Sequence, residues 1–539
     1  MESDGSVGGA DGGARGRGPA AVLVEVALVA LLFAAAGAWP TPDTNEAHYL
    51  TRARHGWNPA WLEGDFFLES REAHGVFSFL IGPLAAEWPL GSAAWAGRIA
   101  GWGALAAGFT FAASAAIPAP GWRLAAAALF SLAARSTTAA GEWVIGGCEA
   151  KVFAWGLVFA GIGWFARGRL AAAWITLGMA SALHPLVGGW GMVALAVALA
   201  WSARSADAAL PWPVPAARSI LPLVVGLLLA AVGVVPALGL SAGVDAAGRD
   251  AAIATYVVER LPHHLLVRTF NEALVARHLL AIAVWWLLLP ASTTAAQRRV
   301  AAFTVGALAI SGAGLAVSLL ESAAPALAHR LLRFYWFRLA DGVLPAGLSI
   351  AAVAALSAAG GARMAAGRRR TALVALAAVL AFDLATESRH WPLPGRPAVA
   401  SRADKGLQGA AWLEVCDWIR AHTPADACFL TPRGASSFHW HAERREVVCW
   451  KNIPQDAAGI LEWRRRIVDC FSADGSLKNL VSSTPSLGRD RLAAAARKYG
   501  ADHVVVPLNP FDPPPLDGEP LHVAGPYAVY RLDPPADTP

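Results

Sequence analysis

The residues best suited to acid–base chemistry lie close together near the N-terminus, between Thr41 and Ser70. This stretch follows the first long apolar run, and it carries Asp43, Glu46, His48, Glu63, Asp65 and Glu69. Carboxylate and imidazole groups can exchange protons with a reacting group that lies within hydrogen-bond reach. Aromatic residues are interleaved with them, which indicates a loop that folds back onto a bilayer surface. We therefore expect the chemistry of the protein in this loop.

A second set of candidate residues lies in the connections that follow later apolar runs. Its members are ionisable groups, which are costly to place near a bilayer without a role: Glu149, Lys151, Arg260, His263, His264, Arg333 and Arg338. Glu149 and Lys151 could bind a substrate or simply neutralise each other. The adjacent histidines beside Arg260 could bind a phosphate, carry out acid–base chemistry or be ordinary interfacial residues.

The segment from Arg333 to Asp341 is the densest mixture of basic and aromatic side chains. Its arginines fall on the side of the membrane where short connections otherwise lack basic residues, so we expect them to be paired or to bind a ligand. A guanidinium group suits a phosphate or pyrophosphate, which it can bind in a bidentate fashion. The alternative is that Arg338 pairs with Asp341, three residues on, along one helix surface.

The composition indicates the environment in which these residues work. Of the 539 residues, 56% are hydrophobic and only 15% are charged, whereas soluble domains carry roughly a quarter charged residues. The formal net charge of +5 comes from arginines clustered between apolar runs. This pattern is typical of membrane topology and argues against nucleic-acid binding. The sequence thus predicts a polytopic α-helical membrane protein.

About eleven apolar runs are candidate transmembrane helices. They cover residues 21–39, 97–117, 123–141, 151–166, 170–183, 186–202, 219–240, 277–294, 300–320, 339–360 and 371–387. Two choices decide this count: Val76–Pro89 is interpreted as a juxtamembrane helix, and His184-Pro185 as the break between two spans. With the N-terminus inside, every short basic connection then falls on the cytoplasmic side, as the positive-inside rule requires.

This topology predicts three regions: a disordered tail at 1–20, a transmembrane domain at 21–387 with an extracytoplasmic loop 1 at 40–96, and an extracytoplasmic α/β domain at 388–539. In the last region, strands are predicted at Ala427–Thr431, Glu446–Trp450, Asp502–Leu508 and Tyr527–Leu532. Helices are predicted at Gly409–His422, Ala457–Cys470 and Asp490–Tyr499.

Two features of the C-terminal region resemble metal or disulfide sites. His439 and His441 lack a neighbouring carboxylate motif, so we interpret them as surface or substrate-shaping residues. Four of the five cysteines lie in this region without a C-x-x-C pair, which excludes a zinc interpretation from spacing. Disulfides and free buried thiols both stay open.

The order of these features resembles the GT-C superfamily of integral membrane glycosyltransferases. The resemblance rests on Asn45-Glu46-Ala-His-Tyr49 after the first span, the W-x-x-G-D-F-F segment at 61–67, the juxtamembrane helix, and Ala96-Gly97-Arg98 at the next span. The protein mannosyltransferases and the lipid A aminoarabinose transferases share this layout. The closest similarity in build is to bacterial, planctomycete-like membrane proteins.

The resemblance implies a fold, a function and a site. A loop-1 carboxylate would activate the acceptor, and Glu46 or Asp43 stands where that base is expected. The sugar would come from a polyprenyl-phosphate-linked donor, whose phosphate would meet Arg260, His263, Arg333 and Arg338. The acceptor would be a glycan, lipid or protein at the extracytoplasmic face of the bacterial cytoplasmic membrane. No D-x-D motif occurs in loop 1, so a divalent metal stays open as a cofactor without being required.

Two other classes of protein compete with a glycosyltransferase. A transporter or flippase would show inverted repeats and charges near the middle of the membrane, whereas the polar residues here cluster at the outer ends of the predicted spans. A non-catalytic protein that binds a polyprenyl lipid is favoured by Asn45, which stands where the superfamily usually has an aspartate.

Overall fold

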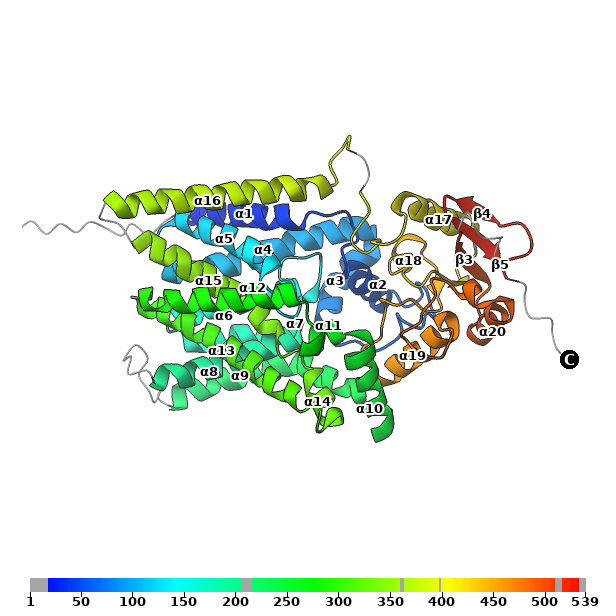
Figure 1. Cartoon of the computed structure of the whole chain (residues 1–539), viewed down its shortest axis with the longest axis horizontal. Coiled ribbons are helices and arrows are strands. Elements are labelled where there is room, and N and C mark those ends of the chain that lie inside the picture. Colours follow the sequence, from blue (N-terminus) through cyan, green and yellow to red (C-terminus); the bar gives the residue numbers. More distant parts are fainter. Residues whose placement is uncertain (1–17, 205–215, 359–362, 397–398, 509–515, 533–539) are drawn as a thin grey trace, which may run out of the picture.

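The computed structural model describes residues 18–204, 216–358, 363–396, 399–508 and 516–532. A bundle of long helices forms one part of the molecule, and a smaller domain of helices and strands caps one end of it (Figure 1). Among the described residues, eight helices are long and apolar enough to cross a membrane. The chain is therefore a helical membrane protein. Of the predicted disordered tail at 1–20, residues 1–17 lie outside the described residues.

Each of the eleven predicted apolar ranges coincides with a helix of the bundle. These helices are α1 (Pro19–Gly37), α4 (Leu90–Ala116), α5 (Pro120–Ser136), α6 (Ala150–Ala166), α7 (Leu170–Leu183), α8 (Pro185–Arg204), α9 (Ala216–Leu238), α12 (Glu272–Leu288), α13 (Ala295–Leu319), α15 (Arg338–Ala358) and α16 (Arg363–Glu387). The predicted break after α7 is confirmed, because α8 begins at Pro185, and proline is favoured at the first position of a helix. Helices α5, α6 and α7 have 17, 17 and 14 residues, fewer than the roughly 20 of a full span.

The bundle is held together by aromatic side chains and by close helix contacts. Phe109 of α4 stacks on Phe130 of α5, with ring centroids 4.8 Å apart, and both rings belong to the buried core. A Cβ atom at Gly108 of α4 would overlap the backbone of Gly156 in α6. Small residues let helix backbones approach in this way, which increases van der Waals contact where no water is present to drive association.

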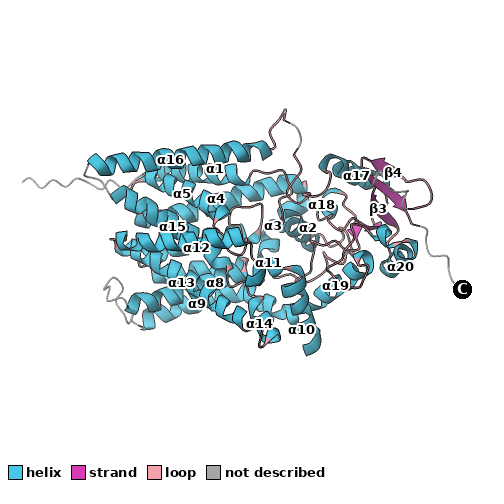
Figure 2. Cartoon of the chain, in the orientation of Figure 1, coloured by secondary structure: helices cyan, strands magenta, loops and turns pink. Residues whose placement is uncertain are grey.

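Short helices gather at the end of the bundle that faces the smaller domain (Figure 2). Loop 1 folds into α2 (Glu46–Trp57) and α3 (Gly75–Glu87), so the predicted juxtamembrane helix is present. The connection after α9 contains η1 (Gly239–Ser241), α10 (Ala246–Ala254), the π-helical turn η2 (Thr255–Arg260), α11 (Pro262–Leu265) and η3 (Val267–Thr269). The remaining short elements are η4 (Leu289–Ala291), α14 (Pro325–Leu332) and η5 (Ser388–His390).

The C-terminal part is built on one five-stranded sheet with the order β2-β1-β3-β5-β4. Its strands are β1 (Cys428–Leu430), β2 (Arg445–Glu446), β3 (His503–Pro507), β4 (His522–Ala524) and β5 (Tyr527–Arg531), and its helices are α17 (Gly409–His422), α18 (Phe438–His441), α19 (Ala457–Phe471), η6 (Thr484–Leu487) and α20 (Arg489–Tyr499). Successive residues of β3 point to opposite faces. Val504 and Val506 accordingly join the core beneath α19, and Val505 joins the core beneath α17.

Most elements of the C-terminal part were predicted from the sequence, but two short strands were not predicted correctly. The helices α17, α19 and α20 and the strands β1, β3 and β5 were all expected. The run Glu446–Trp450 forms a strand only at Glu446 and then becomes a loop, and β4 has only three residues. The five cysteines, all in the described part of the chain, are free and buried.

Candidate anion-binding cavity

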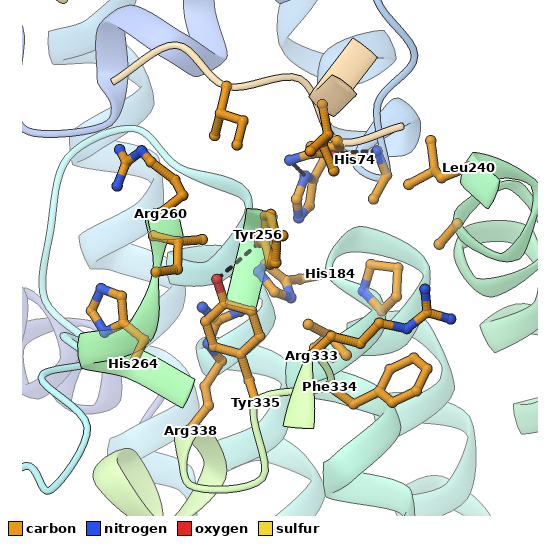
Figure 3. Close-up of a pocket in the computed structure, with 18 of the residues that line it drawn as sticks. His74, His184, Leu240, Tyr256, Arg260, His264, Arg333, Phe334, Tyr335 and Arg338 are labelled. Carbon is orange, nitrogen blue, oxygen red and sulfur yellow. Dashed lines mark hydrogen bonds between the residues drawn. The ribbon is translucent and has the colours of Figure 1, made fainter. Parts of the chain in front are cut away.

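A cavity of about 440 Å³ lies where the helical bundle, loop 1 and the C-terminal domain meet. Figure 3 shows side chains from remote parts of the chain converging on it. Six basic side chains line it, against one carboxylate: Lys151, Arg249, Arg260, Arg333, Arg338 and Lys451, with Glu142. Four histidines also line it: His48, His74, His184 and His264. The cavity therefore carries an excess of positive charge.

The carboxylate of Glu142 is neutralised twice. One of its oxygens lies 2.8 Å from the ammonium of Lys151, and the other accepts a 2.8 Å hydrogen bond from Nε of Arg338. Burial alone would raise the pKa of Glu142, but the charges of Arg338 and Lys151 outweigh it and hold that pKa at about 2. Glu142 is consequently ionised at neutral pH, and Arg338 and Lys151 are the two cavity cations with a close counter-ion.

The loop that carries Glu142 is held by a buried aspartate of α15. The carboxylate of Asp341 accepts hydrogen bonds from the backbone N–H groups of Ala139, Ala140 and Glu142, at 2.6 to 3.2 Å. The structure therefore excludes the alternative in which Arg338 pairs with Asp341. Arg338 pairs with Glu142, far away in the sequence, and Asp341 fixes the backbone beside it.

Four other cavity cations have no carboxylate partner within 4 Å among the described residues. Arg249 is exposed, whereas Arg260, Arg333 and Lys451 are at least partly buried. Nε of Arg260 donates to the backbone oxygen of Trp450 at 3.0 Å, and Nε of Arg333 is buried without a hydrogen bond in the described structure. Burial lowers the pKa of Arg260 and of Arg333, and it lowers the pKa of Lys451 to about 8. Such cations are costly to bury unless an anion compensates them.

A strained backbone turn presents an aromatic residue to the cavity. Tyr335 has a φ of 55°, a region that bulky residues rarely adopt. Its hydroxyl lies 2.9 Å from that of Tyr256 in η2, and the guanidinium of Arg338 lies 3.8 Å from the centre of its ring. A π-helical turn and a strained residue often mark functional sites. Here they place Tyr335 between Tyr256 and Arg338.

The cavity histidines are neutral at physiological pH. Burial and the charge of Arg338 lower the pKa of His74 to about 3, and burial lowers the pKa of His264 to about 4. Burial also lowers the pKa of His184 well below its usual value. His263 does not line the cavity but packs against His264, with ring centroids 4.2 Å apart. Neutral imidazoles can accept or donate hydrogen bonds to a ligand without adding charge.

The structure places the two loop-1 carboxylates away from the cavity lining. Each oxygen of Glu46 accepts two hydrogen bonds, with both Nε and Nη2 of Arg98 at 2.6 Å. The backbone N–H groups of Asp43 and Cys148 supply the other two donors, at 2.7 and 2.6 Å. One oxygen of Asp43 accepts from the backbone of Thr44, and the other lies 3.6 Å from Arg402. Both carboxylates are buried.

Glu149 is a neighbour of the cavity and not part of its lining. One of its oxygens accepts a 3.1 Å hydrogen bond from the amide of Asn45 and lies 3.5 Å from Lys151. Burial raises the pKa of Glu149. The predicted neutralisation of Glu149 by Lys151 is thus partial, because Glu142 is the closer partner of that lysine. Asn45, in contrast, does line the cavity.

Of the residues predicted from sequence, Lys151, Arg260, His264, Arg333 and Arg338 line this one cavity. Sequence reasoning missed the roles of Glu142, Tyr256 and Tyr335, and it missed His74, His184 and Lys451. The arginines could be found because they lie on the side of the membrane where short connections otherwise lack basic residues. No comparable signal marks Lys451, which belongs to a different part of the chain.

The C-terminal domain is joined to loop 1 by a buried charged pair. Nε2 of His439 lies 2.7 Å from a carboxylate oxygen of Asp65, which also accepts from the backbone of Glu446 at 3.0 Å. The interpretation of His439 as a surface residue is therefore wrong: its side chain is buried at the joint between the two parts. Within the described residues, no cluster of three potential ligands could hold a metal ion.

The fold and the cavity define a helical membrane protein with a cation-rich site beneath a small C-terminal domain. Residues 410–470 match a protein family described as a domain of unknown function (DUF6798). The matched segment runs from α17 into α19 and includes Lys451. The comparison with curated proteins finds no match.

Proposed function

We propose that the protein is a membrane glycosyltransferase of the GT-C type, which transfers a sugar from a polyprenyl-phosphate-linked donor to an extracytoplasmic acceptor. The observation that carries this proposal is the cavity with six basic side chains and one carboxylate. Four of the basic groups have no carboxylate within 4 Å in the described chain. A bound phosphate would supply the missing negative charge, because charge-assisted hydrogen bonds to phosphate are among the strongest that a protein makes.

The apolar side of the cavity supports a lipid as the carrier of that phosphate. Val234, Ala237 and Leu238 at the end of α9 contribute to the lining, together with Leu240. Leu238 is 65% exposed, and it lies in a candidate membrane span. The rim of the cavity is thus continuous with an apolar outer surface of the bundle. A ligand with a charged head and a hydrocarbon chain matches both sides.

In the proposed reaction, an acceptor hydroxyl or amine attacks the anomeric carbon of the donor sugar. The bond from that carbon to the phosphate oxygen breaks, and negative charge grows on the departing polyprenyl phosphate. Arg333 and Arg338 would stabilise that charge. The acceptor proton would pass to Glu142, the carboxylate that lines the cavity. Donor phosphate would compete for Arg338 and Lys151, which would raise the pKa of Glu142 and make it a better base.

A specific observation favours the alternative of a non-catalytic protein that binds a polyprenyl lipid. Glu46, the loop-1 carboxylate expected to act as a base, has all its acceptor positions occupied by Arg98 and backbone N–H groups. In this alternative, the cavity binds the lipid phosphate and no transfer follows.

The first test measures binding of undecaprenyl phosphate to the purified protein in lipid nanodiscs. Arg333→Ala and Arg338→Ala should each weaken binding roughly ten- to a hundredfold, the loss expected for one charge-assisted contact. Arg370→Ala, on α16 and exposed, is the matched control and should bind as the unaltered protein does. Equal affinity of all three variants would contradict a phosphate site at this position. Transfer of a radiolabelled sugar from a polyprenyl-phosphate donor then separates the enzyme from the lipid-binding alternative.

A further inference from the structure

We infer that Lys451, in the segment matched by the domain of unknown function, contacts the phosphate group of the ligand that enters the cavity. The role of that segment would then be to close the cavity and to complete its anion site. This inference rests on the proposed function in one respect, namely that the ligand carries a phosphate. It goes beyond that proposal by assigning a binding residue to the C-terminal domain.

Lys451 of the C-terminal domain reaches the cavity of the membrane part. It lies in the loop between β2 and α19, and it lines the same cavity as Arg260 and Arg333 of the membrane part. Its ammonium has neither a hydrogen bond nor a carboxylate within 4 Å in the described structure. A lysine held in a recess without a partner is poised for an anionic ligand.

The backbone beside Lys451 is fixed from both sides of the joint. Nε1 of Trp463, within the C-terminal domain, donates to the backbone oxygen of Cys449 at 3.0 Å. Nε of Arg260, from η2, donates to the backbone oxygen of Trp450 at 3.0 Å. Arg260 therefore has two roles: it lines the cavity, and it holds the residue before Lys451.

The β2–α19 loop cannot leave the cavity independently of loop 1. The backbone N–H of Ala73 donates to the side chain of Gln455 at 2.6 Å, and that of Arg71 donates to Asp456 at 3.2 Å. Together with the buried pair of Asp65 and His439, these contacts hold the β2–α19 loop on loop 1. Lys451 is thus held at the cavity, as a binding residue must be.

An anion bound in the cavity would favour the charged form of Lys451. The positive charge of Arg260 and burial both act against protonation of Lys451, whose pKa falls to about 8. A phosphate placed between Lys451 and Arg260 would reverse that effect, because it attracts both cations. Removing the Lys451 charge should therefore reduce affinity for the phosphorylated lipid and leave affinity for the unphosphorylated lipid unchanged.

The experiment compares the full-length protein and three variants in nanodiscs, with undecaprenyl phosphate, undecaprenol and inorganic phosphate as probes. Lys451→Met removes the charge while keeping an unbranched apolar stem, and Lys451→Arg keeps the charge. Lys478→Met is the matched control, because Lys478 is an exposed lysine of the same domain. Thermal unfolding of each variant verifies that it is folded.

We expect Lys451→Met to weaken undecaprenyl phosphate binding at least roughly tenfold, with Lys451→Arg and Lys478→Met within a few-fold of the unaltered protein. Binding of inorganic phosphate with the same dependence on Lys451 would support the phosphate contact. It would also show that the hydrocarbon chain of the lipid only increases the affinity. One result would overturn this inference and leave the proposed function standing. In that result the unaltered protein binds undecaprenyl phosphate, Arg333→Ala weakens this binding, and Lys451→Met leaves it unchanged. If the unaltered protein binds neither phosphorylated probe, both are overturned.

Discussion

The carboxylate of Glu46 and the guanidinium of Arg98 form a bidentate pair, with two hydrogen bonds of 2.6 Å and no exposure of either side chain to solvent. Glu46 begins α2 in loop 1, and Arg98 belongs to α4. A third segment joins them, since the backbone N–H of Cys148 donates to the same carboxylate. This pair therefore connects loop 1, the bundle and the loop before α6, next to the cavity and not inside it.

The first prediction concerns stability. A solvated carboxylate can be replaced by its amide at little cost to the fold, but Glu46 is fully buried. In the structure, Glu46→Gln leaves the buried guanidinium of Arg98 uncompensated. Breaking a buried ion pair in this way costs about 3–5 kcal/mol, so we expect a clear drop in the midpoint of thermal unfolding. Glu63→Gln, at an exposed position of the same loop, should unfold as the unaltered protein does. Equal midpoints for both variants would contradict a structural role for Glu46.

The helices of the bundle could be predicted because long apolar runs have few alternatives. A run such as Leu90–Ala116 must satisfy its backbone hydrogen bonds internally if it meets lipid, and an α-helix does so. The arginines of the cavity were detectable for a related reason: Arg333 and Arg338 lie on the side of the membrane where short connections otherwise lack basic residues. Both features depend on local sequence and composition.

The partners of the site residues were not predictable, because they depend on contacts between distant parts of the chain. Glu142 and Arg338 are 196 residues apart, and Asp65 and His439 are 374 apart. Nothing in the sequence around Glu46 indicates that its carboxylate pairs with Arg98. Likewise, Lys451 is an ordinary lysine in the sequence, and only the position of the β2–α19 loop against η2 brings it to the cavity.

The second prediction concerns the joint between loop 1 and the C-terminal domain. Burial would lower the pKa of His439, but the charge of Asp65 outweighs it and raises that pKa, so the pair stabilises the joint when His439 is protonated. This stabilisation is fully present below the unfolded pKa of about 6.5 and is lost as the pH rises through the raised folded value. Burial also raises the pKa of Glu446, to about 7, and ionising this buried group as the pH rises acts in the same direction.

The joint should therefore weaken as the pH rises through neutrality. Protease susceptibility of the segment between α16 and α17, or hydrogen exchange of α18, would measure this. His439→Gln keeps a hydrogen-bond donor without the charge and should flatten the pH dependence, whereas His422→Gln, at an exposed histidine, should not alter it. A steeper loss of protection in His439→Gln would argue against the pair as the cause.

The third prediction concerns orientation. Arg167 follows the end of α6 that is opposite to the cavity residue Lys151. Arg298, at the start of α13, lies beside it, since Nη1 of Arg299 donates to the backbone oxygen of Ala166 at 3.0 Å. If the positive-inside rule applies, the cavity and the C-terminal domain face away from the cytoplasm. Alkaline phosphatase, which is active only outside the cytoplasm, should be active when fused after Pro539 and inactive when fused in the connection between α8 and α9. The opposite pattern would place the cavity on the cytoplasmic side and exclude an extracytoplasmic acceptor.

The last prediction separates catalysis from binding through Glu142. Glu142→Gln removes the negative charge that occupies Arg338 and Lys151, so both cations become free to bind a phosphate. Undecaprenyl phosphate should bind more tightly to this variant, by about a few-fold to tenfold, because one repulsive charge has been removed from the site. Sugar transfer should fall about 100- to 10,000-fold if Glu142 is the base. Glu63→Gln, the same substitution at an exposed position of loop 1, should change neither quantity to a comparable extent. Weaker lipid binding in Glu142→Gln would show that the carboxylate holds Arg338 in its binding position, and retained transfer would remove Glu142 from the reaction.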